Sequence, residues 1–237
     1  MEFHPLPALA AGFLLSLALA ASARAAPFVV TTTADGNNGA CTVSLCTLRD
    51  AVIAANAIPG STITLPSNAS PYKLILTGVN EQAAATGDLD VTANMTINGG
   101  GAATTVIDGN GTDRVFEVIG QVALILNGVT VTNGNTSTST VKDGGGILGA
   151  NSSLVVLNNS VVTANNAATG QGGGIFSGSL TMTNSTVSQN QTSNQGGGVF
   201  VVSASISGST ISSNHSTGDQ GGGLFLINGG TSLEPFI

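Results

Sequence analysis

Four copies of one motif, three glycines followed by an aliphatic residue, dominate the second half of the chain. The copies begin at Gly144, Gly172, Gly196 and Gly221, so their spacings are 28, 24 and 25 residues. A recurring period of this size is typical of a solenoid, in which each coil stacks on its neighbour. Short segments that alternate polar and apolar residues, such as 179–183, supply the strands. A coil of about 24 residues with three strands and three bends predicts an all-β fold, a right-handed parallel β-helix.

The aligned repeats place similar residues at the same position of successive coils. Two positions are aliphatic and are expected to form the core: Val156, Met182 and Ile206 at one, Val162, Val187 and Ile211 at the other. Two others hold Gly or Asn: Gly128, Asn159, Asn184 and Gly208 at one, Gly134, Asn165, Asn190 and Asn214 at the other. Because Gly and Asn tolerate a positive φ, both positions are expected to be bends. Asn159 and Asn184 are expected to adopt this conformation or to form a polar ladder between coils.

A phenylalanine follows the aliphatic residue in three of the motifs. These are Phe176, Phe200 and Phe225, and strand alternation places them opposite Ile175, Val199 and Leu224. Only one of the two columns can lie fully in the core. If the phenylalanines face outward, they form an aromatic stripe that can bind sugar rings; if not, they fill a corner of the coil or pack beneath a loop.

Charged residues are scarce and mostly acidic. The 237 residues include 5 Lys and Arg, 12 Asp and Glu, one Tyr and no Trp, and the net charge is -7. Such a chain offers no basic surface to phosphates and little aromatic surface to bases, so nucleic acid is excluded as a partner. A hydrophobic fraction of 41% also excludes a disordered chain.

The N-terminus resembles a secretory signal. Residues 8–21 are apolar but too few to span a bilayer, and Ala23-Arg24-Ala25 has the small residues of a cleavage site. Residues 1–7 lack the usual basic residues. We predict cleavage after Ala25 and an exported protein, secreted or at the cell surface, whose mature chain has no transmembrane segment.

The only cysteines, Cys41 and Cys46, lie close together in the sequence. A metal site would need two further ligands, and the nearest histidine is His215. In an oxidising compartment a local disulfide is therefore favoured.

Residues 28–57 contain Phe28-Val29-Val30-Thr31-Thr32, a polar loop, and then Cys46-Thr47-Leu48-Arg49-Asp50-Ala51. This segment resembles the N-terminal module of bacterial exported β-helix proteins named after a Cys-Ser-Leu-Arg-Glu-Ala motif, with Thr47 and Asp50 as departures. Segments 87–91, 106–109 and 113–116 are also similar to that family, and the glycine coils resemble those of polymorphic outer-membrane proteins. The resemblance implies export and a pectate-lyase-like fold, and it brings no catalytic residues.

This motif predicts a short helix that caps the N-terminal end of the β-helix. Thr47 and Asp50 have the spacing of a capping box. Three apolar residues fall on one face of the helix and are expected to cover the first coil: Leu48, Val52 and Ala55. Arg49 is expected to form a structural ion pair with Asp50.

Asp88 and Asp90 are the best candidates for chemistry. At i and i+2 in a strand they share a face, so the two carboxylates can bind a cation or shift each other's pKa, or else hydrogen-bond the N-terminal coil. A second group is expected to form surface ion pairs: Asp108, Asp113, Arg114 and Glu117. His215 is expected to be a solvated bend residue.

We predict three segments: a signal peptide at 1–25, a cap module at 26–60 and the β-helix at 61–237, with an inserted loop at 136–142. No capping pattern follows the fourth motif, so truncation or end-to-end self-association is expected there. No cofactor is predicted. The expected function is an exported scaffold for adhesion or recognition of an extracellular glycan or protein; the alternative is a polysaccharide lyase or hydrolase, or a degenerate relative of one.

Overall fold

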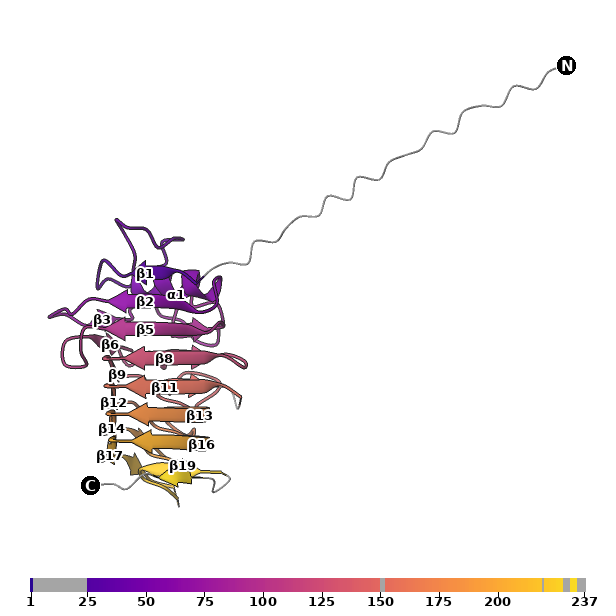
Figure 1. Ribbon diagram of the computed structural model, residues 1–237. Coiled ribbons are helices and arrows are strands. Elements are labelled where there is room, and N and C mark those ends of the chain that lie inside the picture. Colours follow the sequence, from indigo (N-terminus) through magenta and orange to yellow (C-terminus); the bar gives the residue numbers. More distant parts are fainter. Residues whose placement is uncertain (2–24, 150–151, 219, 228–230, 234–237) are drawn as a thin grey trace.

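The computed structural model describes Met1 and residues 25–149, 152–218, 220–227 and 231–233. Apart from Met1 and Ala25, the predicted signal peptide lies outside these residues, so its cleavage stays a prediction. All strand pairs in the described chain are parallel, and strands from successive coils stack in sequence order along one axis (Figure 1). The predicted parallel β-helix is therefore confirmed.

The coil has three faces, of which the first two belong to one sheet. The first face contains β1 (Pro27–Val29), β2 (Ser61–Leu65), β5 (Met95–Gly99), β8 (Ala123–Asn127), β11 (Leu154–Asn158), the second halves of β13 (Ile175–Thr183) and β16 (Val199–Ser207), and β20 (Thr231–Leu233). The second face contains β4 (Leu89–Val91), β7 (Phe116–Val118), β10 (Ile147–Gly149), the first halves of β13 and β16, and β19 (Leu224–Leu226). β13 and β16 thus run across the corner between these faces.

The third face is a separate six-stranded sheet, and a two-stranded sheet follows it. The third face contains β3 (Tyr72–Lys73), β6 (Val106–Asp108), β9 (Thr130–Thr132), β12 (Val161–Thr163), β14 (Thr186–Ser188) and β17 (Thr210–Ser212). The small sheet pairs β15 (Gln191–Thr192) with β18 (His215–Ser216). His215 lies on this small sheet and is exposed, as expected.

Aliphatic side chains from the three faces fill the interior. Val162, Val187 and Ile211 are in register, as predicted. The other predicted core position is wrong in one coil, because Leu157 and not Val156 pairs with Met182. Leu157 is fully buried and Val156 only half-buried. The glycine motif lies three residues further from this strand than it does in the next coil, so counting from the glycines misplaces the register.

The glycine triplets turn the chain where successive coils approach closely. Gly144, the first glycine of its motif, has a φ of 63°, which an L side chain rarely adopts. At Gly146, a Cβ would lie 2.8 Å from the carbonyl oxygen of Gly174 in the next coil. Backbone conformation explains the first glycine, and contact between coils explains the third.

The two predicted bend positions behave differently. At the first, Asn159 and Asn184 both have a φ of 49°, as predicted. At the second, the prediction is wrong by one residue. The left-handed residues there precede the Gly and Asn column: Asn133, Ala164, Gln189 and Ser213.

The asparagines of the second position instead point inward and form a ladder. Asn165 Nδ2 donates to Asn190 Oδ1 at 2.9 Å, and Asn190 Nδ2 donates to Asn214 Oδ1 at 3.0 Å. The same oxygens accept the backbone N–H groups of Asn165 and Asn190. Because Asn165 and Asn190 are buried, this amide ladder satisfies polar groups inside the coil.

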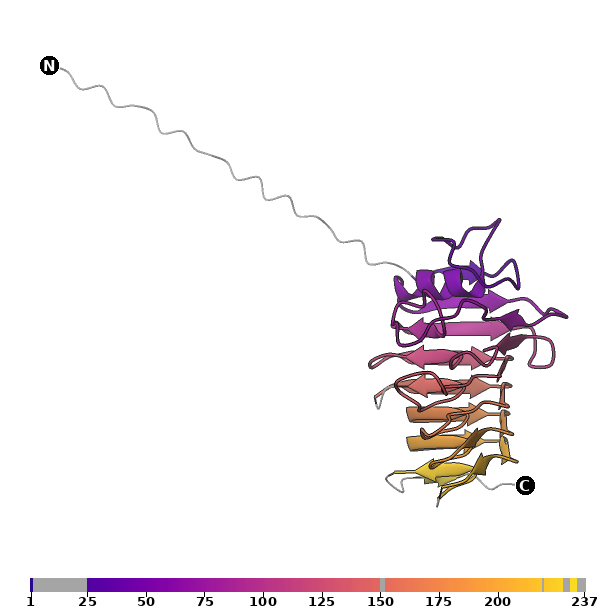
Figure 2. The same cartoon turned by 180° about the vertical axis from the view of Figure 1, so that it is seen from behind.

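Helix α1 (Leu48–Asn56) covers the N-terminal end of the core, as predicted (Figure 2). Asp50 N donates to Thr47 Oγ1 at 3.0 Å, and Thr47 N donates to Asp50 Oδ2 at 3.2 Å, which completes the capping box. Leu48, Val52 and Ala55 are all buried. The Cys41–Cys46 disulfide is also present. None of the helices that the structure describes has the length and apolarity of a membrane span.

The last described coil is less covered than the coils before it. Leu224 and Leu226 are half-buried, and Ile227 is 48% exposed. Residues 228–230 and 234–237 lie outside the described chain. Truncation and self-association at this end stay predictions.

Candidate functional site

One outward-facing column runs along the second face. Strand register connects one residue from each coil, and we call this set the second-face column: Asp90, Glu117, Leu148, Phe176, Phe200 and Phe225. Side chains two coils long are acidic, one is aliphatic, and three are aromatic. The two candidate sites of the sequence, the acidic pair and the aromatic stripe, thus lie on the same wall of the molecule.

The phenylalanines point away from the core, because Ile175 and Val199 beside them are fully buried inside it. Phe176 and Phe200 have ring centroids 5.1 Å apart and planes at 4°, and Phe200 and Phe225 repeat this geometry at 5.1 Å and 10°. Rings stacked in this way cover much of each other's faces. Phe200 is only 5% exposed, so the ladder offers ring edges in its middle rather than a flat stripe.

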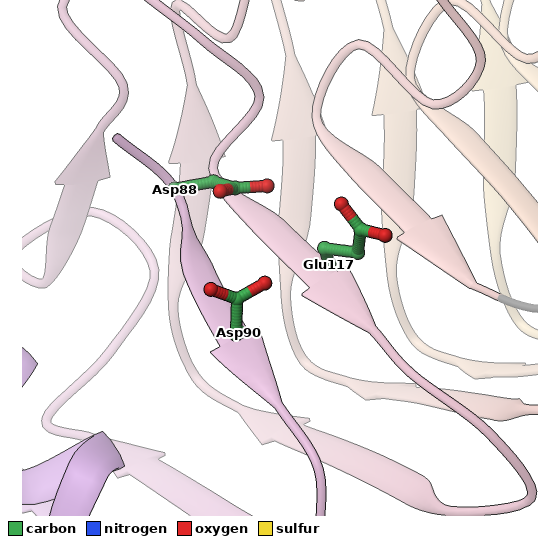
Figure 3. A group of neighbouring side chains, drawn as sticks. All are labelled: Asp88, Asp90 and Glu117. Carbon is green, nitrogen blue, oxygen red and sulfur yellow. The ribbon is translucent and has the colours of Figure 1, made fainter. Parts of the chain in front are cut away.

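At the N-terminal end of the column, three carboxyl groups meet. One oxygen from each of Asp88, Asp90 and Glu117 lies within 4.8 Å of the others. Figure 3 shows Asp90 on β4 turned towards Asp88, with Glu117 beside them on β7. Asp88 and Asp90 are buried, whereas the side chain of Glu117 is 18% exposed.

This cluster joins two groups that the sequence kept apart. Arg114 Nη1 donates to Glu117 Oε2 at 2.8 Å and to Asp88 Oδ2 at 3.3 Å. Asp113 and Arg114 are 1% and 2% exposed, so the expected surface ion pairs are wrong. Parallel pairing of β4 with β7 brings the two groups together across one coil.

The inserted loop covers part of the cluster instead of standing free. Ser139 Oγ donates to Asp113 Oδ1 at 2.5 Å, and Arg114 Nη2 donates to the carbonyl oxygen of Val141 at 2.6 Å. Thr140 N donates to Asn80 Oδ1 at 2.7 Å. The insertion therefore helps to bury these charges.

Arg49 has a structural role, but its predicted partner is wrong. Its Nε donates to Asp35 Oδ1 at 2.8 Å, and its other nitrogens reach the carbonyl oxygens of Ala84, Gly87 and Asp88. Asp50 is used by the helix cap and by Asn38. Arg49 therefore ties α1 to the segment that carries Asp88.

Asp108 belongs to a different part of the molecule. It lies on β6 of the third face, where its Oδ1 accepts from Asn110 N at 2.8 Å and from Asn133 Nδ2 at 3.0 Å. Two adjoining hollows on this face share Asp108 and Asn133 as lining residues. We call them the third-face groove; Lys73 lines one of its ends.

Burial disfavours the charged forms of the clustered acids. It raises the pKa of Asp88 to about 8, with the charge of Asp113 adding to the effect and Arg114 opposing it. Burial also raises the pKa of Asp90 to about 7, and the charge of Glu81 contributes in the same direction. The pKa of Glu117 is raised by burial despite Arg114. The bound-proton or bound-cation state of this cluster thus changes near neutral pH.

A hollow of about 360 Å³ lies between the acidic cluster and the phenylalanine ladder. Its walls include Glu117, Val141, Asp143, Leu148 and Phe176. Asp143 was not among the predicted site residues. Its place at the end of the insertion, next to a glycine motif, was the available signal, but only the fold brings it to the hollow that Glu117 also lines.

The remaining predicted residues have structural surroundings. Cys41, Cys46, Thr47 and Asp50 belong to the cap, and Asn159, Asn184 and Asn190 belong to the bends and the amide ladder. The wall that carries Asp90, Glu117 and Phe176 is thus the candidate site. No family model matches the chain, and comparison with curated proteins and with solved structures also finds no match.

Proposed function

We propose that this protein is an exported β-helix scaffold that recognises an extracellular glycan on its second face, without changing it chemically. The observation that supports this is the hollow beside Phe176, which combines apolar and carboxyl groups on one surface. A sugar ring has an apolar face that packs on aromatic and aliphatic side chains, and hydroxyl groups that donate to carboxylates. Phe176 and Leu148 supply the first kind of contact, and Glu117 and Asp143 supply the second.

The position of Phe176 in the ladder favours it as the contact residue. Phe200 has a phenylalanine on both sides, whereas Phe176 has Phe200 on one side and Leu148 on the other. Phe176 is half-buried and lines the hollow. The stack also fixes the orientation of its ring, which reduces the entropy lost on binding.

Export is supported by the predicted signal peptide and by the disulfide, which persists in oxidising compartments. Sequencing the N-terminus of the secreted protein tests this part. A chain that begins at Ala26 is expected, and an intact N-terminus in the cell interior would contradict it.

The test of recognition is binding of the purified full chain to pectate, alginate and neutral glycans, with and without calcium. Phe176→Ala is expected to weaken binding at least about tenfold, equivalent to about 1.4 kcal/mol. Lys73→Ala, in the third-face groove, is the matched control and should leave affinity unchanged. If Lys73→Ala weakens binding and Phe176→Ala does not, the second-face assignment is wrong; capture of a protein but no glycan would also overturn it.

A second candidate function, glycan hydrolysis, is favoured by one observation. Glu117 and Asp143 line the same hollow, and the raised pKa of Glu117 suits a general acid. The same glycan panel distinguishes the two: release of reducing ends that Glu117→Gln abolishes indicates catalysis, whereas binding without product indicates recognition. Asp88 and Asp90 are too deeply buried to touch a sugar.

A further inference from the structure

We infer that Asp88, Asp90 and Glu117 form a binding site for a hard divalent cation of the Ca²⁺ type. This inference does not depend on glycan recognition. Ca²⁺ takes oxygen ligands at about 2.3–2.6 Å, so two ligands on opposite sides of the ion lie at most about 5 Å apart. The three carboxyl oxygens lie within 4.8 Å of one another, which is compatible with that sphere.

Asp90 provides the second, independent observation. Its side chain is fully buried, and its Oδ2 accepts the N–H of Ala84 at 2.6 Å. Within the described residues, its Oδ1 is buried and receives no hydrogen bond. A buried carboxylate oxygen without a donor is costly, and a bound cation supplies the missing partner.

The local charge balance points the same way. Five carboxyl groups gather here: Glu81, Asp88, Asp90, Asp113 and Glu117. Among the described residues, Arg114 is the one cation that pairs with any of them, and it contacts Asp88 and Glu117 but not Asp90. A divalent ion beside Asp90 balances the charge that Arg114 leaves over, and Arg114 then orients two of the ligands.

The site also has an entrance. Asp88 and Asp90 are buried, but Glu117 lines the hollow of about 360 Å³ that opens between the insertion and the second face. Asp143 lies in the same hollow and attracts a cation towards it. An ion can therefore reach Glu117 first and then the two aspartates.

Calorimetric titration of the full chain, previously dialysed against EDTA and then against chelator-free buffer, tests the inference with CaCl₂. One saturable site per chain is expected. Asp90→Asn is expected to weaken it at least about tenfold, since even outer-sphere residues change metal affinity by this factor. Asp108→Asn removes a similarly buried carboxylate on the third face and is the matched control, with affinity expected within about twofold of wild type.

Thermal unfolding provides a readout that does not depend on a calorimetric signal. With Ca²⁺ at about 100 times its dissociation constant, the unfolding equilibrium should shift about 100-fold towards the folded state. Glu117→Gln, at the more exposed end of the cluster, replaces Asp90→Asn if that variant does not fold. The inference is overturned if wild type shows no saturable uptake, if neither cluster variant weakens it, or if MgCl₂ binds as tightly as CaCl₂.

Discussion

The two halves of the β-helix achieve the same fold with different chemistry. Between Gly144 and Gly218 the sequence has no Asp, Glu, Lys or Arg, and the coils there close their bends with neutral ladders such as Asn165–Asn190–Asn214. Before Gly144, the described chain buries ion pairs of Arg49 and Arg114.

Coil length differs in the same way. The core residues Ile63, Ile97, Leu126 and Leu157 are in register but 34, 29 and 31 residues apart. Leu157, Met182 and Ile206 are only 25 and 24 residues apart. The regular coils repeat one solution to the problem of satisfying buried polar groups. The irregular coils carry the extra residues, the buried charges and the raised pKa values that accompany function.

The largest effect that separates the halves should be a dependence of stability on pH. The folded-state pKa of Asp88 is raised from 3.8 to about 8, so the folded chain keeps a proton that the unfolded chain loses first. In a chelator, stability is expected to fall as pH rises from about 4 to 8, by roughly 5 kcal/mol for this one group. Urea unfolding across this range measures it.

Asp88→Asn should flatten that pH profile, whereas Asp108→Asn should keep its slope. The pKa of Asp50 is lowered despite its burial, by hydrogen bonds from Asn38 and Thr47, so its contribution is lost only at the acid end, as pH falls below 3.8. Stability that stays level or rises between pH 4 and 8 would refute the assignment of buried, proton-holding acids to this half.

The next largest effect should come from Arg49. Arg49→Met leaves Asp35 as a buried charge without its guanidinium and removes hydrogen bonds to three carbonyl groups, so we expect a loss of about 3–5 kcal/mol. Chemical denaturation measures the free energy of unfolding. Adding Asp35→Asn should recover part of the loss, and a single variant within about 1 kcal/mol of wild type would show that the pair is not structural.

The neutral half should depend on its amide ladder to a smaller extent. Asn190→Ala removes hydrogen bonds to Asn165, Asn214 and the carbonyl oxygen of Val162, and about 2 kcal/mol of stability is expected to be lost. Asn194→Ala, outside the ladder, should change stability by less than about 0.5 kcal/mol. The Asn190 effect should not vary between pH 4 and 8, and a pH-dependent loss would blur the contrast between the halves.

The smallest expected effect concerns one bend. Asn184 has a φ of 49°, so Asn184→Gly should be nearly neutral and Asn184→Val should lose about 1–2 kcal/mol through backbone strain. Thermal unfolding of both variants resolves this difference. A Val variant as stable as the Gly variant would mean that the backbone at this bend relaxes out of the left-handed region.

Local periodicity determined much of the architecture. The glycine spacing predicted the stacked parallel coils, and the residues around Thr47 predicted a capped helix over the first coil. Such features depend on backbone conformation and on residues close in sequence, and Asn184 shows that even a positive φ can be predicted this way. The errors at Val156 and at the second bend column arose where neighbouring coils differ in length or where a side chain turns inward.

The site required the tertiary structure. The sequence contains Asp88, Asp90, Glu117 and the phenylalanines, but their order along one wall depends on how many residues each loop inserts between strands. It does not indicate that Arg49 pairs with Asp35, that the insertion covers Arg114, or that Asp143 and Glu117 line one hollow. Within one coil, hydrogen bonding and alternation follow from adjacent residues. Between coils, contacts and the burial that shifts a pKa exist only after the chain has closed its loops and set its register.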